Sequence, residues 1–232
     1  MPEQKISIII PVINEGEILG STLQQLKKNQ AGYVGEILVV DGGSRDNTVQ
    51  IAADSGAKVL HSEKKSRAAQ MNLGARMAKE EILFFLHADT IPPEGFDRDI
   101  IIAVNRGADF GSFPMRFDWE HPLLGFYGKF THLKSGFLKF GDQSLFVKRR
   151  LFEKVCGFDE SLFVMEDQKI VRELMKAGEY RLMNKEVVTS ARKYRENGVL
   201  KLQTIFVFIY IGYYLGCSQE VLIHFYRSAI DL

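Results

Sequence analysis

The chain has few cysteines and no long hydrophobic run, and each absence excludes a class of protein. Its 232 residues include two cysteines, Cys156 and Cys217, which are too few for a disulfide framework and show no CxxC or Cys/His spacing typical of zinc sites. The longest nearly uninterrupted apolar stretch, residues 205–215, is well short of the roughly 20 residues that span a bilayer as a helix. The amino terminus also lacks the long apolar segment of a signal peptide. We therefore expect a reduced, cytoplasmic protein.

An excess of either charge is also missing. Thirty lysines and arginines against 29 aspartates and glutamates give a net charge of +1, so no overall field attracts the protein to nucleic acid. The length favours one main domain with an appendage, since a chain of this size can bury a large core. We expect a main domain over residues 1–198 and a C-terminal apolar and amphipathic helical extension over residues 199–232.

The hydrophobic pattern alternates between strands and helices. A β-branched run at residues 5–12 predicts a strand that is buried on both faces, and apolar residues at helical spacing follow it before a second apolar run at 37–40. A helix over 48–55 and a strand at 58–61 repeat the unit. Such alternation predicts an α/β fold with a mostly parallel central sheet and helices on both faces.

The rest of the chain continues the pattern less regularly. We expect strands at 82–86, 142–147, 180–183 and 187–189, an extended segment at 109–117, and helices at 96–105, 150–155, 166–178 and 219–230. A further helix follows the basic loop at 64–67. The aromatic and glycine-rich residues 118–141 match neither period, so we assign them no structure.

Acidic residues follow the strands at the points where ligands of open α/β sheets bind. Asp41 ends one apolar run and Asp89 follows another, while Glu166 and Asp167 begin a helix. Carboxylates that gather at one edge of a sheet repel one another unless a cation or a substrate donor holds them, so the group indicates metal or hydroxyl binding. Each acid also has a plainer explanation, because Asp41 can form a turn and an acidic pair favours the positive end of a helix.

Asp41 is followed by a loop of glycine and polar residues. Gly42 and Gly43 allow a tight turn directly after Asp41. Asp46 and Thr48 are residue types that cap helices, and we expect them to be structural.

The order of the motifs resembles that of a known family. The motifs are IIIPVINE, VVDGGSRDNT, RAAQMNLGA, FFLHADT, GDQSLFV, GFDE and MEDQ. In this order they resemble the family 2 glycosyltransferases, inverting enzymes with the Rossmann-like GT-A fold, over residues 6–195. The resemblance is greatest to small bacterial members with an LHADT motif.

The resemblance implies a nucleoside-diphospho-sugar donor, most simply a UDP-sugar, and a divalent cation, Mn²⁺ or Mg²⁺. It implies that Asp41 binds the nucleobase, that Asp89 binds the metal as the last acid of the family's DxD motif, and that Asp167 is the general base. The other donor-binding positions that it implies are Pro11, Val12, Asn14, Glu15, Arg67, Asn72 and Arg192. For Arg192 and the adjacent Lys193 a solvated basic loop is an equal alternative.

One position departs from the family pattern. His87 stands where many members have the first acid of DxD, so we expect weaker metal binding. Contact with ribose, contact with metal, and simple packing are all open for this histidine. The chain also lacks the QxxRW motif of processive synthases, which favours a single transfer per encounter. The alternative to an enzyme is a nucleotide-sugar-binding partner protein with little catalysis.

Three interpretations are open for the apolar residues 205–215. They can form a buried helix, a homodimer contact, or a membrane-surface element that offers its aromatic residues to lipid at the inner face of the membrane. A lipid-linked acceptor would favour the third. The sugar, the base and the acceptor are not identified by the sequence.

Overall fold

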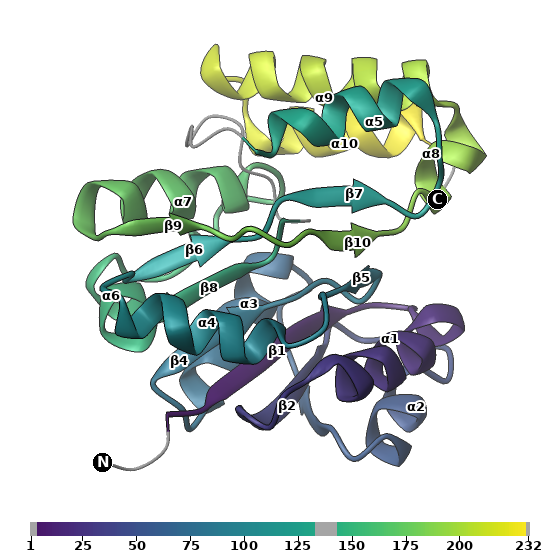
Figure 1. The fold of residues 1–232 in the computed structure, drawn as a ribbon. Coiled ribbons are helices and arrows are strands. Elements are labelled where there is room, and N and C mark those ends of the chain that lie inside the picture. Colours follow the sequence, from purple (N-terminus) through teal and green to yellow (C-terminus); the bar gives the residue numbers. More distant parts are fainter. Residues whose placement is uncertain (1–3, 133–142, 231–232) are drawn as a thin grey trace.

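The computed structural model describes residues 4–132 and 143–230, and within them the chain forms two sheets (Figure 1). The larger sheet has seven strands in the order β3-β2-β1-β4-β8-β6-β9. These strands are β1 Ile6–Val12, β2 Val34–Asp41, β3 Lys58–His61, β4 Ile82–Phe85, β6 Phe110–Ser112, β8 Leu145–Lys148 and β9 Tyr180–Leu182. Strands β1 to β4 are parallel, and β8 runs antiparallel to β4 and β6.

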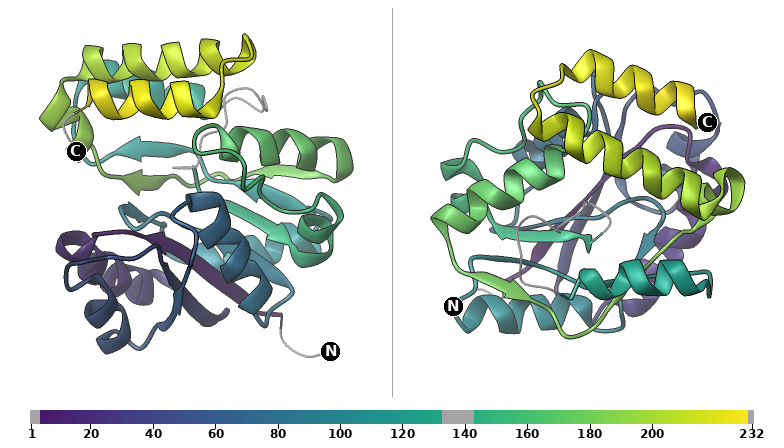
Figure 2. Two further views of the ribbon diagram at one scale, coloured as in Figure 1. Left: turned by 180° about the vertical axis from the view of Figure 1, so that it is seen from behind. Right: turned by 90° about the horizontal axis from the view of Figure 1, so that it is seen from above.

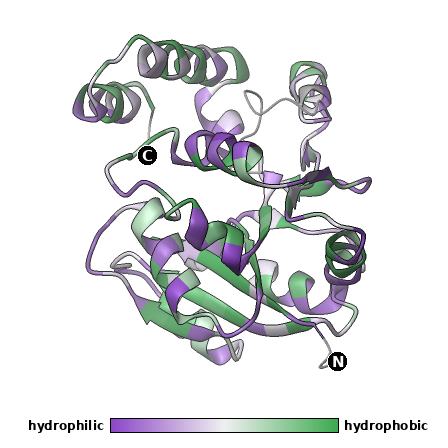
Figure 3. Ribbon diagram, turned by 90° about the vertical axis from the view of Figure 1, so that its left-hand side faces the viewer, coloured by the Kyte–Doolittle hydropathy of each residue, from purple (hydrophilic) through white to green (hydrophobic). Residues whose placement is uncertain are grey.

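Helices cover both faces of the large sheet, as the alternating pattern predicts. Along β1, Ile8 and Ile10 pack into one core cluster and Ile9 packs into the other, because successive strand residues point to opposite faces. Helices α1 Gly16–Asn29, α2 Thr48–Asp54 and α4 Phe96–Asn105 contribute to the first cluster. The second includes residues of α3 Arg67–Met77, α6 Arg149–Lys154 and α7 Glu166–Ala177. Figure 3 shows the hydrophobic residues running along the central strands.

A small second sheet connects the two halves of the chain. It has the order β5-β10-β7, from Thr90–Ile91, Val187–Thr189 and Met115–Phe117. Strand β5 directly follows Asp89, and β10 leads into α8 Arg192–Asn197. The small sheet therefore fixes Asp89 relative to α8.

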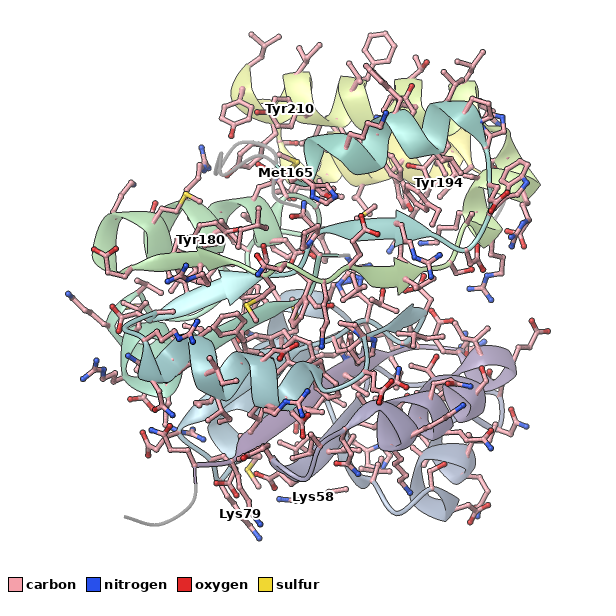
Figure 4. All side chains as sticks on the ribbon, in the orientation of Figure 1. Lys58, Lys79, Met165, Tyr180, Tyr194 and Tyr210 are labelled. Carbon is pink, nitrogen blue, oxygen red and sulfur yellow. The ribbon has the colours of Figure 1, made fainter. Side chains whose placement is uncertain are left out.

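Three helices lie above the two sheets (Figures 1 and 2): α5 Pro122–Phe130, α9 Val199–Tyr214 and α10 Gln219–Ala229. Leu202, Ile205 and Ile209 of α9 form a separate cluster against which Met165 and Tyr194 pack, and both of these lie beneath the upper helices in Figure 4. Within the described ranges, no helix combines the length and the hydrophobicity that crossing a bilayer requires.

Some expected boundaries differ from the structure. The extended segment at 109–117 is two strands in different sheets, because the chain changes direction at Phe113 and Pro114. Helix α5 lies in the stretch to which the pattern assigned no structure. The strand expected at 142–147 begins at residue 145, and residue 142 lies outside the described residues. Gly198 separates α8 from α9 with φ of +82°, and the division into domains at this residue stays a prediction.

Candidate functional site

The central strands bring Val12 and Asp41 to one edge of the sheet. Strands β1, β2 and β4 are parallel neighbours, and Val12 at the end of β1 lies in register with Asp41 at the end of β2. The strand order reverses between β1 and β4, because β2 and β3 lie on one side of β1 and β4 lies on the other. A reversal of this kind opens a crevice outside the carboxyl ends of the strands. The loop with Glu15 and the loop with Asp89 flank it.

The Asp41 carboxylate closes its own loop. It accepts hydrogen bonds from the amides of Gly43 and Ser44, each at 3.0 Å, and His61 Nδ1 lies 3.5 Å away. Burial raises the pKa of Asp41, but the hydrogen bonds from Ser44 and Gly43 outweigh it and lower the pKa overall. Gly43 has φ of +96°, a conformation that favours glycine. The plainer explanation, a turn-forming aspartate, is thus part of the structure, and Asp41 is ionised at neutral pH.

A glutamine that the motif comparison did not single out supports this end of the crevice. Gln70 of α3 is buried, and its Nε2 donates to the carbonyl oxygens of Val12 and Val40 at 2.8 and 2.7 Å. It therefore joins the carboxyl ends of two strands. A Cβ at Gly42 would lie 3.1 Å from this amide, so the first glycine of the loop leaves room for Gln70. A polar residue between the apolar residues Ala69 and Met71 of α3 is the signal that could have identified it.

The loop after β1 is tied to the loop after β2. Asn14 donates its amide to Ser44 Oγ and accepts at Oδ1 from the amide of Arg45. Glu15 donates its amide to Thr48 Oγ1 at 2.8 Å, and Gly16 donates to Asp46 Oδ2 at 3.0 Å. Asp46 and Thr48 therefore satisfy the first amides of α1 from a different loop, a structural role as expected.

Acidic and basic side chains meet across the crevice. Arg192 Nη2 of α8 lies 3.3 Å from Glu15 Oε2. Burial is the main cause that raises the pKa of Glu15, and Asp89 raises it further, while Arg192 and Lys193 lower it. Asp89, Glu15 and Arg192 are therefore neighbours although they come from three distant parts of the sequence.

Hydrogen bonds of the small sheet hold Asp89 in this place. The Asp89 carbonyl oxygen accepts from the amide of Ser190 at 3.1 Å, and the hydroxyls of Thr90 and Thr189 lie 3.1 Å apart. Because β5 and β10 pair here, a shift of Asp89 would also shift the start of α8.

A second ion-pair group lies at the start of α7. Arg67 Nη1 is 3.5 Å from Glu166 Oε1 and 3.9 Å from Asp167 Oδ2. The two acids differ in access, since the Glu166 side chain is 4% exposed and that of Asp167 is 19% exposed. Burial, and then the neighbouring Asp167 charge, raise the pKa of Glu166 to about 7. Asp167 is the more accessible carboxylate of the pair.

His87 is buried beside this group. It lines a small cavity of about 20 Å³ together with Asp167, Ser144 and Phe158, enough space for about one water molecule. Its charge lowers the pKa of Glu166, although less than Arg67 does. The structure thus places His87 toward the Glu166 and Asp167 end of the site.

The side chain of Asn72 forms hydrogen bonds with other residues of the protein. Its amide exchanges hydrogen bonds with the backbone of Phe158 at 2.9 Å in both directions, and it also donates to Glu160 Oε1 at 3.1 Å. A Cβ at Gly157 would lie 2.7 Å from Asn72 Oδ1, so this turn fits closely around the amide. The structure therefore brings Glu15, Asp89 and Arg192 together in one group and Arg67 and Asp167 together in another, whereas Asn72 holds the turn before α7.

The chemistry of the crevice suits a hard divalent cation. Among the residues that the structure describes, no three His, Cys, Asp or Glu side chains gather closely enough to hold a metal by themselves. Mg²⁺ in nucleotide sites is typically bound by one or two carboxylates together with phosphate oxygens and water, and Mn²⁺ also favours oxygen ligands. The half-buried Asp89 carboxylate supplies an oxygen of this kind. The residues present therefore fit a cation whose coordination a diphosphate would complete.

Comparison with known proteins places the chain in a family. The sequence profile of glycosyl transferase family 2 matches residues 7–131, which is more than half of the chain. The chain belongs to glycosyl transferase family 2. The matched residues of this family 2 glycosyltransferase include Asp41, Arg67 and Asp89.

Curated relatives are longer proteins. Residues of this glycosyltransferase are 35% identical to the glycosyltransferase GlyG of Streptococcus pneumoniae over 95 residues, covering 38% of this chain and 31% of that one. The undecaprenyl-phosphate 4-deoxy-4-formamido-L-arabinose transferase of Pseudomonas fluorescens is 33% identical over 107 residues, covering 42% and 31%. The chain therefore spans about a third of the length of these relatives.

Solved structures share the GT-A fold. A mannosyltransferase of Pyrobaculum calidifontis in complex with GDP-Man and Mn²⁺ superposes with a TM-score of 0.69 at 16% identity, covering 97% of this chain and 69% of that one. TarS 1-349 of S. aureus in complex with UDP gives a TM-score of 0.66 at 18% identity, covering 88% and 66%. The expected fold class, α/β with a mostly parallel GT-A sheet and C-terminal helices, is confirmed.

Proposed function

We propose that this protein transfers a sugar from a nucleoside-diphospho-sugar donor to an acceptor with inversion, with the assistance of Mn²⁺ or Mg²⁺ and with one transfer per encounter. The observation that carries the proposal is that two groups pair acids with an arginine, Glu15 and Asp89 with Arg192 and Glu166 and Asp167 with Arg67, while Asp41 ends β2 beside the Glu15 loop. This arrangement provides a nucleoside end, a diphosphate end and an acceptor end in one crevice.

The nucleoside binds at the ends of β1 and β2. Asp41 is ionised and held by its loop, so one of its oxygens accepts a hydrogen bond from the base. Pro11 and Val12 form the wall beneath the nucleoside, while Asn14 keeps the neighbouring loop in place. The UDP and GDP-Man complexes of the structural neighbours support a nucleotide here, and we propose UDP-sugar as the donor.

The diphosphate lies between Asp89 and Arg192. Its departure builds negative charge on the leaving oxygens, and a cation held by Asp89 would neutralise that charge without a proton transfer. Arg192 is drawn from Glu15 toward the diphosphate oxygens, because a doubly charged group competes well with one carboxylate for a guanidinium. Lys193 adds a second positive charge beside it.

Asp167 is the base at the acceptor end. Attack from the face opposite to the leaving group inverts the sugar, and the attacking hydroxyl must lose its proton to a carboxylate that is free of the metal. Asp167 is accessible, whereas Glu166 is buried with a raised pKa. Arg67 contacts both carboxylates and so orients Asp167 toward the crevice. Asn72 positions the turn that precedes this helix.

We propose a lipid-linked acceptor. The relative from Pseudomonas fluorescens bears a name that includes undecaprenyl-phosphate, which supports a lipid-linked acceptor for this chain. The absence of a QxxRW motif from the sequence supports a single transfer rather than polymerisation.

Substitution of the two carboxylates tests the assigned roles. We expect Asp167→Asn to lower kcat by about 10²–10⁴-fold while donor binding persists, because the general base is removed. We expect Asp89→Ala to abolish the metal dependence of donor hydrolysis and transfer. Asp54→Asn, an exposed acid on α2, is the matched control.

Two outcomes would contradict the proposal. Activity that is unaffected by both substitutions would exclude the roles of Asp89 and Asp167. Tight binding of UDP and Mn²⁺ by the wild type with no transfer and no donor hydrolysis would instead favour a nucleotide-sugar-binding partner protein.

A further inference from the structure

The outward side of α9 carries large exposed hydrophobic residues from its first turn to its C-terminal end. Residues Leu200, Val207, Phe208, Ile211 and Leu215 recur at helical spacing and are exposed, Phe208 by 58% and Leu215 by 78%. The opposite face, with Leu202, Ile205 and Ile209, is buried against the rest of the protein. Helices with hydrophobic residues on opposite sides are ordinarily buried on both sides. Here the second side of α9 is exposed to solvent.

Helix α10 extends the same surface. Val221 and Phe225 are exposed on it, and the rings of Phe208 and Phe225 are in edge contact with centroids 6.2 Å apart. Figure 2 shows the two helices lying side by side across the top of the molecule. We call the exposed residues of both helices the tail face, and they are Leu200, Val207, Phe208, Ile211, Tyr214, Leu215, Val221 and Phe225. Contiguous exposed apolar surface of this kind marks an interaction site rather than scattered hydrophobic residues.

The segment of the chain that carries the tail face has an excess of positive charge. Residues 192–230 contain five lysines and arginines and two glutamates, a net charge of +3, which leaves −2 for the rest of a chain whose net charge is +1. Lys201 and Arg227 are exposed on α9 and α10 themselves. Of the five cations in this segment, Arg192 and Arg195 pair with Glu15 and Asp118 in other parts of the chain, so Lys201 and Arg227 are the ones on the helices of the tail face. An apolar face with basic residues around it fits a surface that is both apolar and anionic.

Aromatic residues with polar ends lie at one end of the face. Tyr213 and Tyr214 pack against the Arg172 guanidinium, which lies 5.8 and 5.2 Å from their ring centroids. Tyrosine is favoured where a hydrocarbon layer meets water, because its ring is apolar and its hydroxyl remains hydrated.

The tail face is connected to the acceptor end of the site. Gln219 Oε1, at the start of α10, accepts hydrogen bonds from the amides of Phe163 and Val164 in the loop that precedes α7. Arg172 of α7 also donates to the Tyr213 hydroxyl at 3.3 Å. Docking at the tail face would therefore place Asp167, at the start of α7, close to the docked surface.

We propose that the tail face docks onto the surface of a lipid bilayer with anionic headgroups, with the helices lying along the interface. In a dimer formed through the tail face, the two positively charged segments would repel each other. An anionic bilayer would instead attract this segment. The inference goes beyond the transfer reaction, and it stands whether or not the acceptor is lipid-linked.

Vesicle flotation tests the docking in the absence of donor and acceptor. The probes are vesicles of phosphatidylcholine alone and vesicles of phosphatidylcholine mixed with phosphatidylglycerol. We expect the wild type to float with the mixed vesicles, and we expect the double variant Phe208→Ser/Ile211→Ser to bind them roughly tenfold or more weakly, because two large apolar side chains no longer enter the interface. The double variant Lys201→Glu/Arg227→Glu should lose its preference for the anionic vesicles.

The control variant is Ile102→Ser, an exposed isoleucine on α4 that is not part of the tail face and should not change binding. Equal thermal unfolding of the variants shows that the fold is retained. Wild-type binding by the Phe208→Ser/Ile211→Ser variant would overturn the proposal. The proposal would also be overturned if the wild type did not bind vesicles and sedimented as a dimer while the Phe208→Ser/Ile211→Ser variant sedimented as a monomer. Donor hydrolysis, measured separately without vesicles, tests the proposed transfer site and does not depend on the outcome of the flotation experiment.

Discussion

Two adjacent residues of the site, Glu166 and Asp167, differ in a way that the sequence does not reveal. Both lie in the first turn of α7, where a carboxylate favours the positive end of the helix. One side chain turns into the protein and the other toward the crevice, so the pKa of Glu166 rises to about 7 while Asp167 stays accessible. Sequence motifs identify the pair, but only the packing around α7 distinguishes its members.

The raised pKa of Glu166 predicts a pH-dependent stability. Its unfolded pKa is near 4.5, so the carboxyl contributes its full stability below that pH and loses the contribution as pH rises to about 7, where it ionises in a buried place. The loss is at most about 3.5 kcal/mol, since one pKa unit corresponds to about 1.4 kcal/mol. We expect Glu166→Gln to gain stability relative to the wild type between pH 5 and pH 8 in urea unfolding. The exposed control Glu17→Gln should show no such difference, and a constant difference for Glu166→Gln would contradict the assignment.

At the scale of elements, the sequence predicts the regular core and misses the parts fixed by distant contacts. The strands β1, β2 and β4 are identified because continuous β-branched and apolar runs are typical of strands buried on both faces. Helix α5 was missed because Gly125 and Gly128 interrupt its pattern, and the helix packs only one side against β7 and α8. Residues 109–117 form two strands because β6 pairs with β9 and β7 pairs with β10. Both partner strands lie more than 60 residues away in the sequence, so a local pattern does not reveal them.

The junction between α1 and the loop after β2 is such a distant contact and can be tested. Thr48 is fully buried, and its hydroxyl accepts from the amide of Glu15 at 2.8 Å. We expect Thr48→Val to lower the free energy of unfolding by about 1–3 kcal/mol, because the amide stays buried without a partner. Donor affinity should also fall, since Asn14 and Glu15 belong to the same loop. Denaturant midpoints measure the first effect and nucleotide titration the second.

Thr204→Val is the matched control for Thr48→Val. Thr204 is exposed on α9, and its hydroxyl donates only to the carbonyl of Leu200 in its own helix. We expect a stability change within about 0.5 kcal/mol for this variant. Equal effects of the two substitutions would show that the junction at Thr48 does not hold the loop.

For the whole molecule, the site is formed by contacts between the two halves of the chain. Glu15 forms an ion pair with Arg192, which lies 177 residues later in the sequence. Arg67 lies close to Glu166, which follows it by about a hundred residues. The motifs give each residue a place along the chain, but their pairing depends on the strand order and on the small sheet that joins β5 to β10. A ligand that contacts both halves should therefore stabilise the molecule as a unit.

Thermal unfolding with nucleotide and metal tests this coupling. A ligand present at a hundred times its Kd stabilises the folded state by about 2.7 kcal/mol, which for a chain of this size raises Tm by roughly 5–10 °C. We expect UDP with Mn²⁺ to produce such a rise, and UDP alone to produce a smaller one because the diphosphate charge then lacks its cation. Asp89→Ala should retain the effect of UDP and lose the additional effect of Mn²⁺, whereas Asp41→Asn should reduce both. A rise with Mn²⁺ that is as large in Asp89→Ala as in the wild type would show that the metal binds elsewhere, and the diphosphate end of the crevice would then need to be assigned to other residues.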